Sequence, residues 1–330
     1  MIKRSSGNLA KLITALVLVY IIWGSTYLAI KFAIETMPSF LMAGTRFVVA
    51  GSFIYLLSFF SKGYTRPRVS HWRSSLILGF LLLGVGNGAV VVGQHYISSS
   101  LTALLLATVP LWMVMIGWAF MGTGRPGTKV ALGLGLGFFG VALLVMGQNG
   151  NGSADGYSGV YGIGFMMAAA IGWSVGSLYG AKAPTVPSTL QGAGMQMLCG
   201  GALMLLFGTI TGEWATFDIA AISFNSWLAL GYLIVFGAVV AFTAYSWLMT
   251  NTTPAIMSTY AYVNPMIAVL LGWLIAGEEM NAVMLVGTAI VVGSVVLITS
   301  NKGRADTGES DEDVHFSQMP GDDAQCLAKA

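Results

Sequence analysis

Ten runs of apolar residues divide this chain, and each is long enough to cross a lipid bilayer as a helix. The hydrocarbon core of a bilayer is about 30 Å thick and needs about 20 helical residues, and a spanning segment must satisfy its backbone hydrogen bonds internally. Only 8% of the 330 residues are charged, whereas soluble domains carry about 25%. We therefore predict an all-α integral membrane protein with ten transmembrane helices. The runs cover residues 12–33, 39–60, 75–97, 101–122, 128–147, 158–182, 189–211, 226–249, 254–276 and 282–300.

The placement of charge predicts the orientation of these helices. Lysine and arginine precede the first run, lie in the second, fourth and sixth connections and follow the last run, whereas the acidic residues before the tail lie in the odd-numbered connections. Because basic loops face the cytoplasm, we expect a multi-pass protein of the cell inner (plasma) membrane with both termini cytoplasmic. The basic residues are Lys3, Arg4, Lys11, Lys62, Arg66, Arg68, Arg73, Arg125, Lys129, Lys182, Lys302 and Arg304.

Two of the runs are near-copies of each other, and each carries a proline in its middle. Pro110 and Pro265 are both followed by a Gly-Trp pair at the same spacing. A proline inside a helix removes a backbone hydrogen bond, and lipid offers no substitute partner. Matched interrupted helices in two halves of a membrane protein are a pointer to a transport site.

Further segments repeat at an offset of about 150 residues, as Trp23 and Trp173 do. Each half then holds five runs, and because five is odd the second copy enters the membrane from the opposite side, which predicts two inverted five-helix repeats. The predicted units are a cytoplasmic N-terminus (1–11), a first repeat with helices 1–5 (12–148), an outer loop (149–157), a second repeat with helices 6–10 (158–300) and a disordered cytoplasmic tail (301–330).

Aromatic and small polar side chains share helix faces with the prolines. Trp23, Thr26 and Tyr27 follow one another at helical spacing, and Trp173 and Ser177 repeat the pattern in the second half. An aromatic, uncharged lining suits small amphipathic or zwitterionic solutes, although tryptophans near helix ends also form interfacial belts. The predicted cavity residues are Trp23, Thr26, Tyr27, Asn87, Pro110, Trp173, Ser177, Ser258, Tyr262 and Pro265.

Arg46 lies about seven residues into the second run, roughly 10 Å from its outer end. A charge inside the bilayer is costly, so Arg46 should face inward and find a counter-charge. Glu35 and Glu278 are the two candidates at the outer side. Such an ion pair could be an outer gate that breaks on opening, or a static structural pair.

His95 ends the third run on the outer side. Histidine titrates near neutrality, so it is a possible proton site, although a single interfacial histidine can equally be structural. No acidic residue lies near the middle of any run, which weakens a proton-driven mechanism because proton relays use buried carboxyl groups.

Signatures of enzymes and cofactors are missing from the sequence. It contains no HExxH, CxxC or Walker motif, and the segment 172–176 matches the nucleophile elbow by letter but lies in a predicted helix around Ser174. We predict no enzyme activity, no cofactor, no metal site and no nucleic-acid partner. The expected partners are a small-molecule solute, the lipid bilayer and, through the small-residue faces of 133–137 and 289–293, a second copy of the chain or a neighbouring helix.

Several motifs together resemble the EamA-type branch of the drug/metabolite transporter superfamily. They are Ile22-Trp-Gly-Ser-Thr-Tyr27 with Lys31, Glu35, Pro38, Ala43 and Arg46-Phe47, then Thr108-Val-Pro110, Tyr262-Val-Asn-Pro265 and Gly277-Glu278. The resemblance covers residues 12–300 and implies a ten-helix inverted repeat around a cavity formed by helices 1, 3, 4, 6, 8 and 9. It also implies alternating access and export of amino acids or related metabolites. Gln94 departs from the family pattern, which has an acid before the histidine.

We therefore expect a secondary transporter that exports small metabolites such as amino acids or their analogues. Two alternatives remain open at this point. The aromatic lining would also suit efflux of drugs or other amphipathic compounds. The acidic tail, with Glu309-Ser-Asp-Glu-Asp313, would suit a membrane receptor or scaffold.

Overall fold

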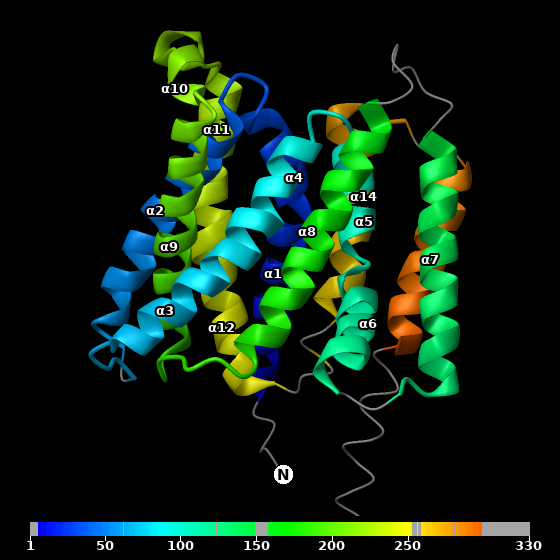
Figure 1. The fold of residues 1–330 in the computed structure, drawn as a ribbon, viewed down its shortest axis with the longest axis horizontal. Coiled ribbons are helices and arrows are strands. Elements are labelled where there is room, and N and C mark those ends of the chain that lie inside the picture. Colours follow the sequence, from blue (N-terminus) through cyan, green and yellow to red (C-terminus); the bar gives the residue numbers. More distant parts are fainter. Residues whose placement is uncertain are drawn as a thin grey trace, which may run out of the picture.

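The computed structural model describes residues 6–61, 63–122, 125–148, 158–252, 256, 259–279 and 282–298. Every regular element in this part of the chain is a helix (Figure 1), as the sequence predicts. The predicted outer loop and acidic tail, together with Ser258 and the side chain of Tyr262, lie outside the described residues.

Seven helical spans in the described residues are long and apolar enough to cross a membrane. Three further apolar stretches are shorter, so the structure supports a multi-pass helical protein. The seven are Leu9–Ala33, Ser39–Ser58, Val69–Gly93, Ser99–Met121, Gly159–Gly180, Thr189–Ile210 and Phe224–Tyr245, and the shorter ones are Thr128–Leu144, Val263–Ala276 and Ala282–Ile298.

The helices stand side by side, with the chain entering α1 at the bottom of Figure 1 and α10 at the opposite end. Three of the apolar spans are built from more than one helical segment. The described elements are α1 (Ser6–Ala33), α2 (Ser39–Ser58), α3 (Val69–Leu78), η1 (Gly79–Asn87), α4 (Gly88–Gly93), α5 (Ser99–Leu106), α6 (Val109–Met121), α7 (Thr128–Gln148), α8 (Ser158–Gly180), α9 (Thr189–Ile210), α10 (Glu213–Thr216), η2 (Ile219–Ala221), α11 (Phe224–Tyr232), η3 (Leu233–Val240), α12 (Ala241–Asn251), α14 (Tyr260–Ala276) and the helix Ala282–Ile298.

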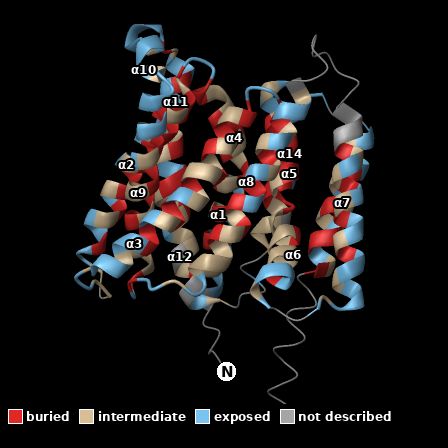
Figure 2. Ribbon diagram, in the orientation of Figure 1, coloured by how far each residue is buried: buried red, intermediate tan, exposed pale blue. Residues whose placement is uncertain are grey.

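Large apolar side chains remain exposed around the outside of the bundle. Phe120 is 84% exposed and Ile210 is 70% exposed, and Figure 2 shows buried residues on the helix faces that turn toward one another. A soluble monomer rarely leaves so much apolar surface uncovered. The exposed apolar side chains are therefore the surface that lipid covers.

Glycines bring α2 and α9 into backbone contact at the left of Figure 1. A Cβ atom added to Gly194 would lie 2.8 Å from the backbone nitrogen of Tyr55, and one on Gly201 would lie 2.8 Å from that of Val48. Small residues permit such close approach between membrane helices. This contact joins the second helix of the first half to its counterpart in the second half.

The small-residue face of α7 packs within the chain. A Cβ atom on Gly133 would lie 2.6 Å from Cγ1 of Ile298, and one on Gly137 would lie 2.8 Å from Oγ of Ser294. Both partners belong to the helix Ala282–Ile298. Packing inside the bundle, one of the two interpretations given above, therefore accounts for the 133–137 face.

Candidate functional site

Two π-helices occupy corresponding places in the two halves of the chain. The segment η1 (Gly79–Asn87) interrupts the third span, and η3 (Leu233–Val240) interrupts the span that begins at Phe224. A π-helix is rare, costs hydrogen-bond geometry and frequently marks a functional site. Neither π-helix is predicted by the sequence, although glycines at positions 84, 86 and 237 indicate unusual backbone there.

Each π-helix is contacted by the tryptophan of the opposite half. The indole Nε1 of Trp23, on α1, donates a hydrogen bond of 3.2 Å to the backbone oxygen of Gly237 in η3. Trp173, on α8, lies so close to Gly86 in η1 that a Cβ there would be 2.7 Å from its indole nitrogen. The predicted equivalence of the two tryptophans thus has a structural counterpart, and both contacts cross between the halves.

An aromatic cluster surrounds Trp23 near the middle of α1. The ring of Trp23 lies 5.0 Å from that of Tyr245 on α12 and 5.4 Å from that of Tyr260 on α14. One turn earlier, the hydroxyl of Tyr20 bonds that of Thr259. These contacts hold α1, α12 and α14 together around Trp23.

Arg46 lies beside the Trp23–Gly237 contact. Its side chain is buried, its guanidinium lies 4.7 Å from the centre of the Phe47 ring, and its Nη2 atom is 3.5 Å from the point where a Cβ on Gly237 would stand. Thr26 on α1 reaches the same point with its methyl group, at 3.2 Å. The interior therefore holds a cation next to a π-helix.

The expected outer ion pair is not formed in this structure. Among the described residues no acid pairs with Arg46, and its Nε atom has no hydrogen-bond partner. Glu35 is exposed, and Glu278 is engaged by other donors. Its carboxylate accepts hydrogen bonds from the backbone N–H groups of Ser99 and Ser100, at 2.7 and 3.0 Å, and from both serine hydroxyls.

The carboxylate of Glu213 also accepts hydrogen bonds from a helix N-terminus. Glu213 accepts hydrogen bonds from the N–H groups of Phe40 and Leu41, at 3.0 and 2.8 Å, in the first turn of α2. Free N–H groups and the helix dipole make a helix N-terminus favourable for an anion. Glu213 and Glu278 each follow a left-handed glycine, with φ of 76° at Gly212 and 63° at Gly277. Each therefore joins a helix end of the second half to a helix start of the first.

A polar cavity of about 410 Å³ lies beside Glu278. Three of the residues singled out from the sequence, Glu35, His95 and Glu278, meet there, while Arg46 does not. Lys31 also lines it and donates hydrogen bonds to the backbone oxygens of Gln94 and Ile97, at 3.2 and 3.1 Å. An ammonium group has three donors, so one proton of Lys31 is left for another acceptor. From the sequence, Lys31 stood out only as part of the motif that resembles the family.

His95 is held at the edge of this cavity by Ser39, whose Oγ lies 2.7 Å from its Nε2. Burial lowers the pKa of His95 below its ordinary value, the nearby Lys31 lowers it further, and Glu213 acts in the opposite direction. The folded protein thus favours the neutral imidazole.

Replacing His95 by glutamine should therefore flatten the pH dependence of stability. An unfolded histidine binds a proton below about pH 6.5, so the parent should lose stability as the pH falls through that value. Unfolding temperatures of His95→Gln and the parent at pH 7.5 and 5.5 test this, with His71→Gln as the matched control. Equal losses in the parent and in His95→Gln would contradict it.

The two prolines differ in their effect on the backbone. Pro110 stands in the first turn of α6, just after the break that ends α5 at Leu106, whereas Pro265 lies inside the continuous helix α14. The expectation of two matched broken helices is therefore wrong for Pro265. Proline is tolerated in a first turn because its missing N–H would have no partner there.

Ser174 forms hydrogen bonds next to the break between α5 and α6. Its hydroxyl donates to the backbone oxygens of Val109 and Ala170, at 3.0 and 2.7 Å, from within α8. Because it lies inside a helix and is fully buried, Ser174 does not form a nucleophile elbow. Its hydrogen bonds are structural ones, at the backbone break between α5 and α6.

The other predicted cavity residues lie on η1, α1 and α8, the elements already described. Asn87, at the end of η1, donates its amide to the backbone oxygen of Leu82 at 3.2 Å. Thr26 donates to the backbone oxygen of Trp23 at 2.6 Å. Tyr27 and Ser177 are partly buried on α1 and α8.

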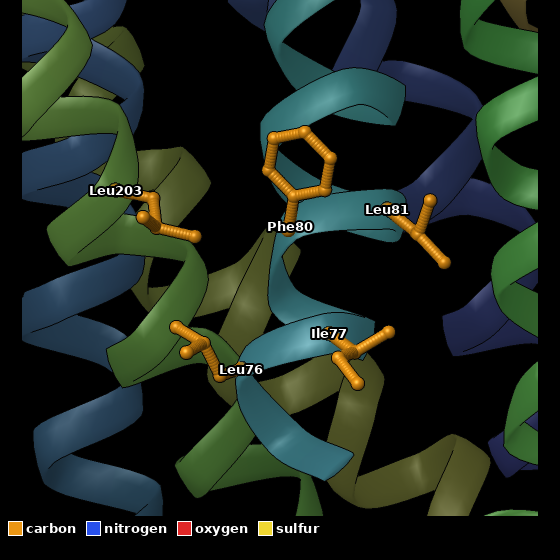
Figure 3. Close-up of a pocket in the computed structure, with 5 residues that line it drawn as sticks. All are labelled: Leu76, Ile77, Phe80, Leu81 and Leu203. Carbon is orange, nitrogen blue, oxygen red and sulfur yellow. The ribbon is translucent and has the colours of Figure 1, made fainter. Parts of the chain in front are cut away.

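A second cleft, of about 360 Å³, is not suited to a polar solute (Figure 3). It is lined only by Leu76, Ile77, Phe80, Leu81 and Leu203, from α3, η1 and α9. Within the described residues, no three His, Cys, Asp or Glu side chains come close enough to hold a metal ion.

A bundle of apolar helices with corresponding special features in its two halves is typical of membrane transporters. The chain belongs to the EamA-like transporter family, whose model matches residues 10–146 and 160–300. It is 36% identical over 298 residues to YedA of Escherichia coli strain K12, described as an uncharacterized inner membrane transporter, with 89% of this chain and 92% of that protein covered. The uncharacterized transporter YvbV of Bacillus subtilis is 24% identical, covering 89% and 93%. A crystal structure that is 19% identical matches 89% of this chain and 97% of its own with a TM-score of 0.58, which shows a shared fold.

Proposed function

We propose that this protein is a secondary transporter that exports small metabolites of the amino-acid class across the inner (plasma) membrane by alternating access. Its ten apolar runs form two inverted five-helix repeats, residues 12–148 and 158–300, with both termini in the cytoplasm. The double match to the family model, the alternation of basic and acidic connections and the inner-membrane relative support this arrangement.

The observation that carries the proposal is the pair of tryptophan contacts with the π-helices. Trp23 bonds the backbone of η3, and Trp173 packs on the backbone of η1. Both contacts link one repeat to the other at an interrupted helix, where a transporter builds its solute site. Rocking of the repeats would make and break such contacts.

The two sides of this site are unequal in the structure. On one side, the cluster of Trp23, Tyr245 and Tyr260 packs the helices together. On the other, the cavity beside Lys31 and Glu278 is open. The cavity is the outer mouth of the pathway, and the aromatic cluster is the inner closure. The cavity is lined by both basic and acidic side chains, which suits a zwitterionic solute.

Uptake into liposomes tests the proposal directly. Purified protein reconstituted with a panel of labelled amino acids should take up at least one of them above empty liposomes, and a pH gradient across the membrane shows whether protons are coupled. Amphipathic dyes belong in the same screen, because the aromatic cluster would also accept them. If the liposomes take up dyes but no amino acid, the transported solutes are amphipathic compounds and the amino-acid proposal is wrong.

Deletion of residues 301–330 separates a transporter from a receptor or scaffold. A transporter should move solute at the parental rate without its acidic tail. Failure of every solute in the parent, with a phenotype that depends on the tail, would overturn the proposed function.

A further inference from the structure

Arg46 is a buried cation for which the described structure supplies no counter-ion. The residue is 6% exposed, and its Nε atom has no hydrogen-bond partner. Only the ring of Phe47, 4.7 Å from the guanidinium carbon, offers partial compensation. An unpaired buried charge is expensive, so an arginine kept in this position calls for an anion that arrives from elsewhere.

Three acids of the described chain, Glu35, Glu213 and Glu278, do not fill this role. The sequence has no Asp or Glu between Glu35 and Asp155, or between Asp155 and Glu213. Glu35 is exposed, and the carboxylates of Glu213 and Glu278 already cap the first turns of α2 and α5. The missing anion is therefore not one of these three carboxylates.

The corresponding position in the second half carries no charge. Gln196 stands 150 residues after Arg46, on α9 where Arg46 is on α2. Both helices make the same close glycine contact with each other. The second half therefore has a neutral amide at this position, and the positive charge occurs only in the first half.

The surroundings of Arg46 are those of the proposed solute site. Its Nη2 atom approaches Gly237, whose backbone oxygen accepts the indole N–H of Trp23, and Thr26 lies against the same glycine. A side chain at position 237 would fill the space next to the guanidinium. Because residue 237 is a glycine, that space beside the guanidinium holds no side chain from η3.

We propose that Arg46 binds the carboxylate of the transported solute, which is then a small organic acid or an amino acid. This inference rests on the proposed function and names its solute class. A guanidinium forms two parallel hydrogen bonds with a carboxylate. The indole of Trp23, which bonds the backbone oxygen of Gly237 next to the guanidinium, would contact the rest of the molecule.

Acid and amide pairs test the proposal by binding alone. Thermal unfolding of the purified protein is measured with each of the twenty amino acids and with its carboxamide, because a bound ligand stabilises the folded state. For at least one pair, the acid should stabilise the parent at a concentration about tenfold lower than the amide. Arg46→Gln should abolish this preference, Arg46→Lys should retain part of it, and Arg125→Gln, at an exposed position, should leave it unchanged.

The ligand-free stability of the same variants separates binding from packing. Arg46→Gln removes an unpaired buried charge and should unfold at the parental temperature or above it. A lower unfolding temperature with an intact acid preference would make Arg46 a packing residue and overturn the inference, as would a parent that never distinguishes acid from amide. Liposome uptake of acids and amides at equal rates would also overturn it while leaving the transport function standing. If the protein prefers acids in binding but transports no solute, the inference about Arg46 stands and the proposed transport function is overturned.

Discussion

Alanine in place of Trp23 should reduce transport by a factor of roughly 30 or more, and alanine in place of Trp173 should also reduce it. The Nε1 hydrogen bond of Trp23 contributes about 1 kcal/mol, and each of its two aromatic contacts about 0.5–1.5 kcal/mol, so Trp23→Ala loses about 2–4 kcal/mol. That energy stabilises one conformation across the two halves, and its loss shifts the conformational equilibrium by the same factor.

Trp118 and Trp273 are the matched controls for this prediction. They are 48% and 49% exposed, in positions that suit an interfacial belt. Alanine at either should leave transport within about twofold of the parent, since exposed substitutions have small effects. Initial uptake rates in liposomes containing equal amounts of protein give the comparison. Equal losses in all four variants would show that the tryptophans act through general packing.

Much of the helical architecture could be predicted because it follows from the hydrophobic pattern. Long apolar runs permit only helices in a membrane, and the repeat of Trp23 at Trp173 was visible as letters at a constant offset. Both tryptophans do contact the opposite half of the chain. The family resemblance, read from motifs that include Arg46 and Gly277-Glu278, is confirmed by the family match.

Backbone irregularities and polar partners were harder to predict. A π-helix has no composition of its own, so η1 and η3 read as ordinary apolar helix. Proline marks a lost hydrogen bond but not a break, and α14 continues through Pro265. The predicted ion pair of Glu278 with Arg46 is wrong, because it considered only the charges of the two side chains. Four donors at a helix N-terminus satisfy the carboxylate instead, and the repeated Gly-Glu dipeptide at 212 and 277 was the overlooked signal.

Glutamine in place of Glu278 should lower the unfolding temperature by about 2 °C or more. The carboxylate accepts from two backbone N–H groups and two hydroxyls of Ser99 and Ser100. A carboxamide keeps one oxygen, and its NH₂ group then faces donors rather than acceptors. Leaving such a donor unpaired costs about 1–3 kcal/mol, and in a chain of this size each kcal/mol shifts the midpoint by about 2–4 °C.

Glu35→Gln makes the same change of charge at an exposed position of the same cavity. It should unfold within about 1 °C of the parent, because exposed substitutions have small effects on stability. Thermal unfolding in detergent, followed by intrinsic fluorescence, compares the variants. If the two glutamine variants unfold together, the cap on α5 contributes nothing to stability. A loss confined to Glu278→Gln means that the end of α14 is fastened to the start of α5 by this carboxylate, so that any outward movement of α14 must first break those four hydrogen bonds.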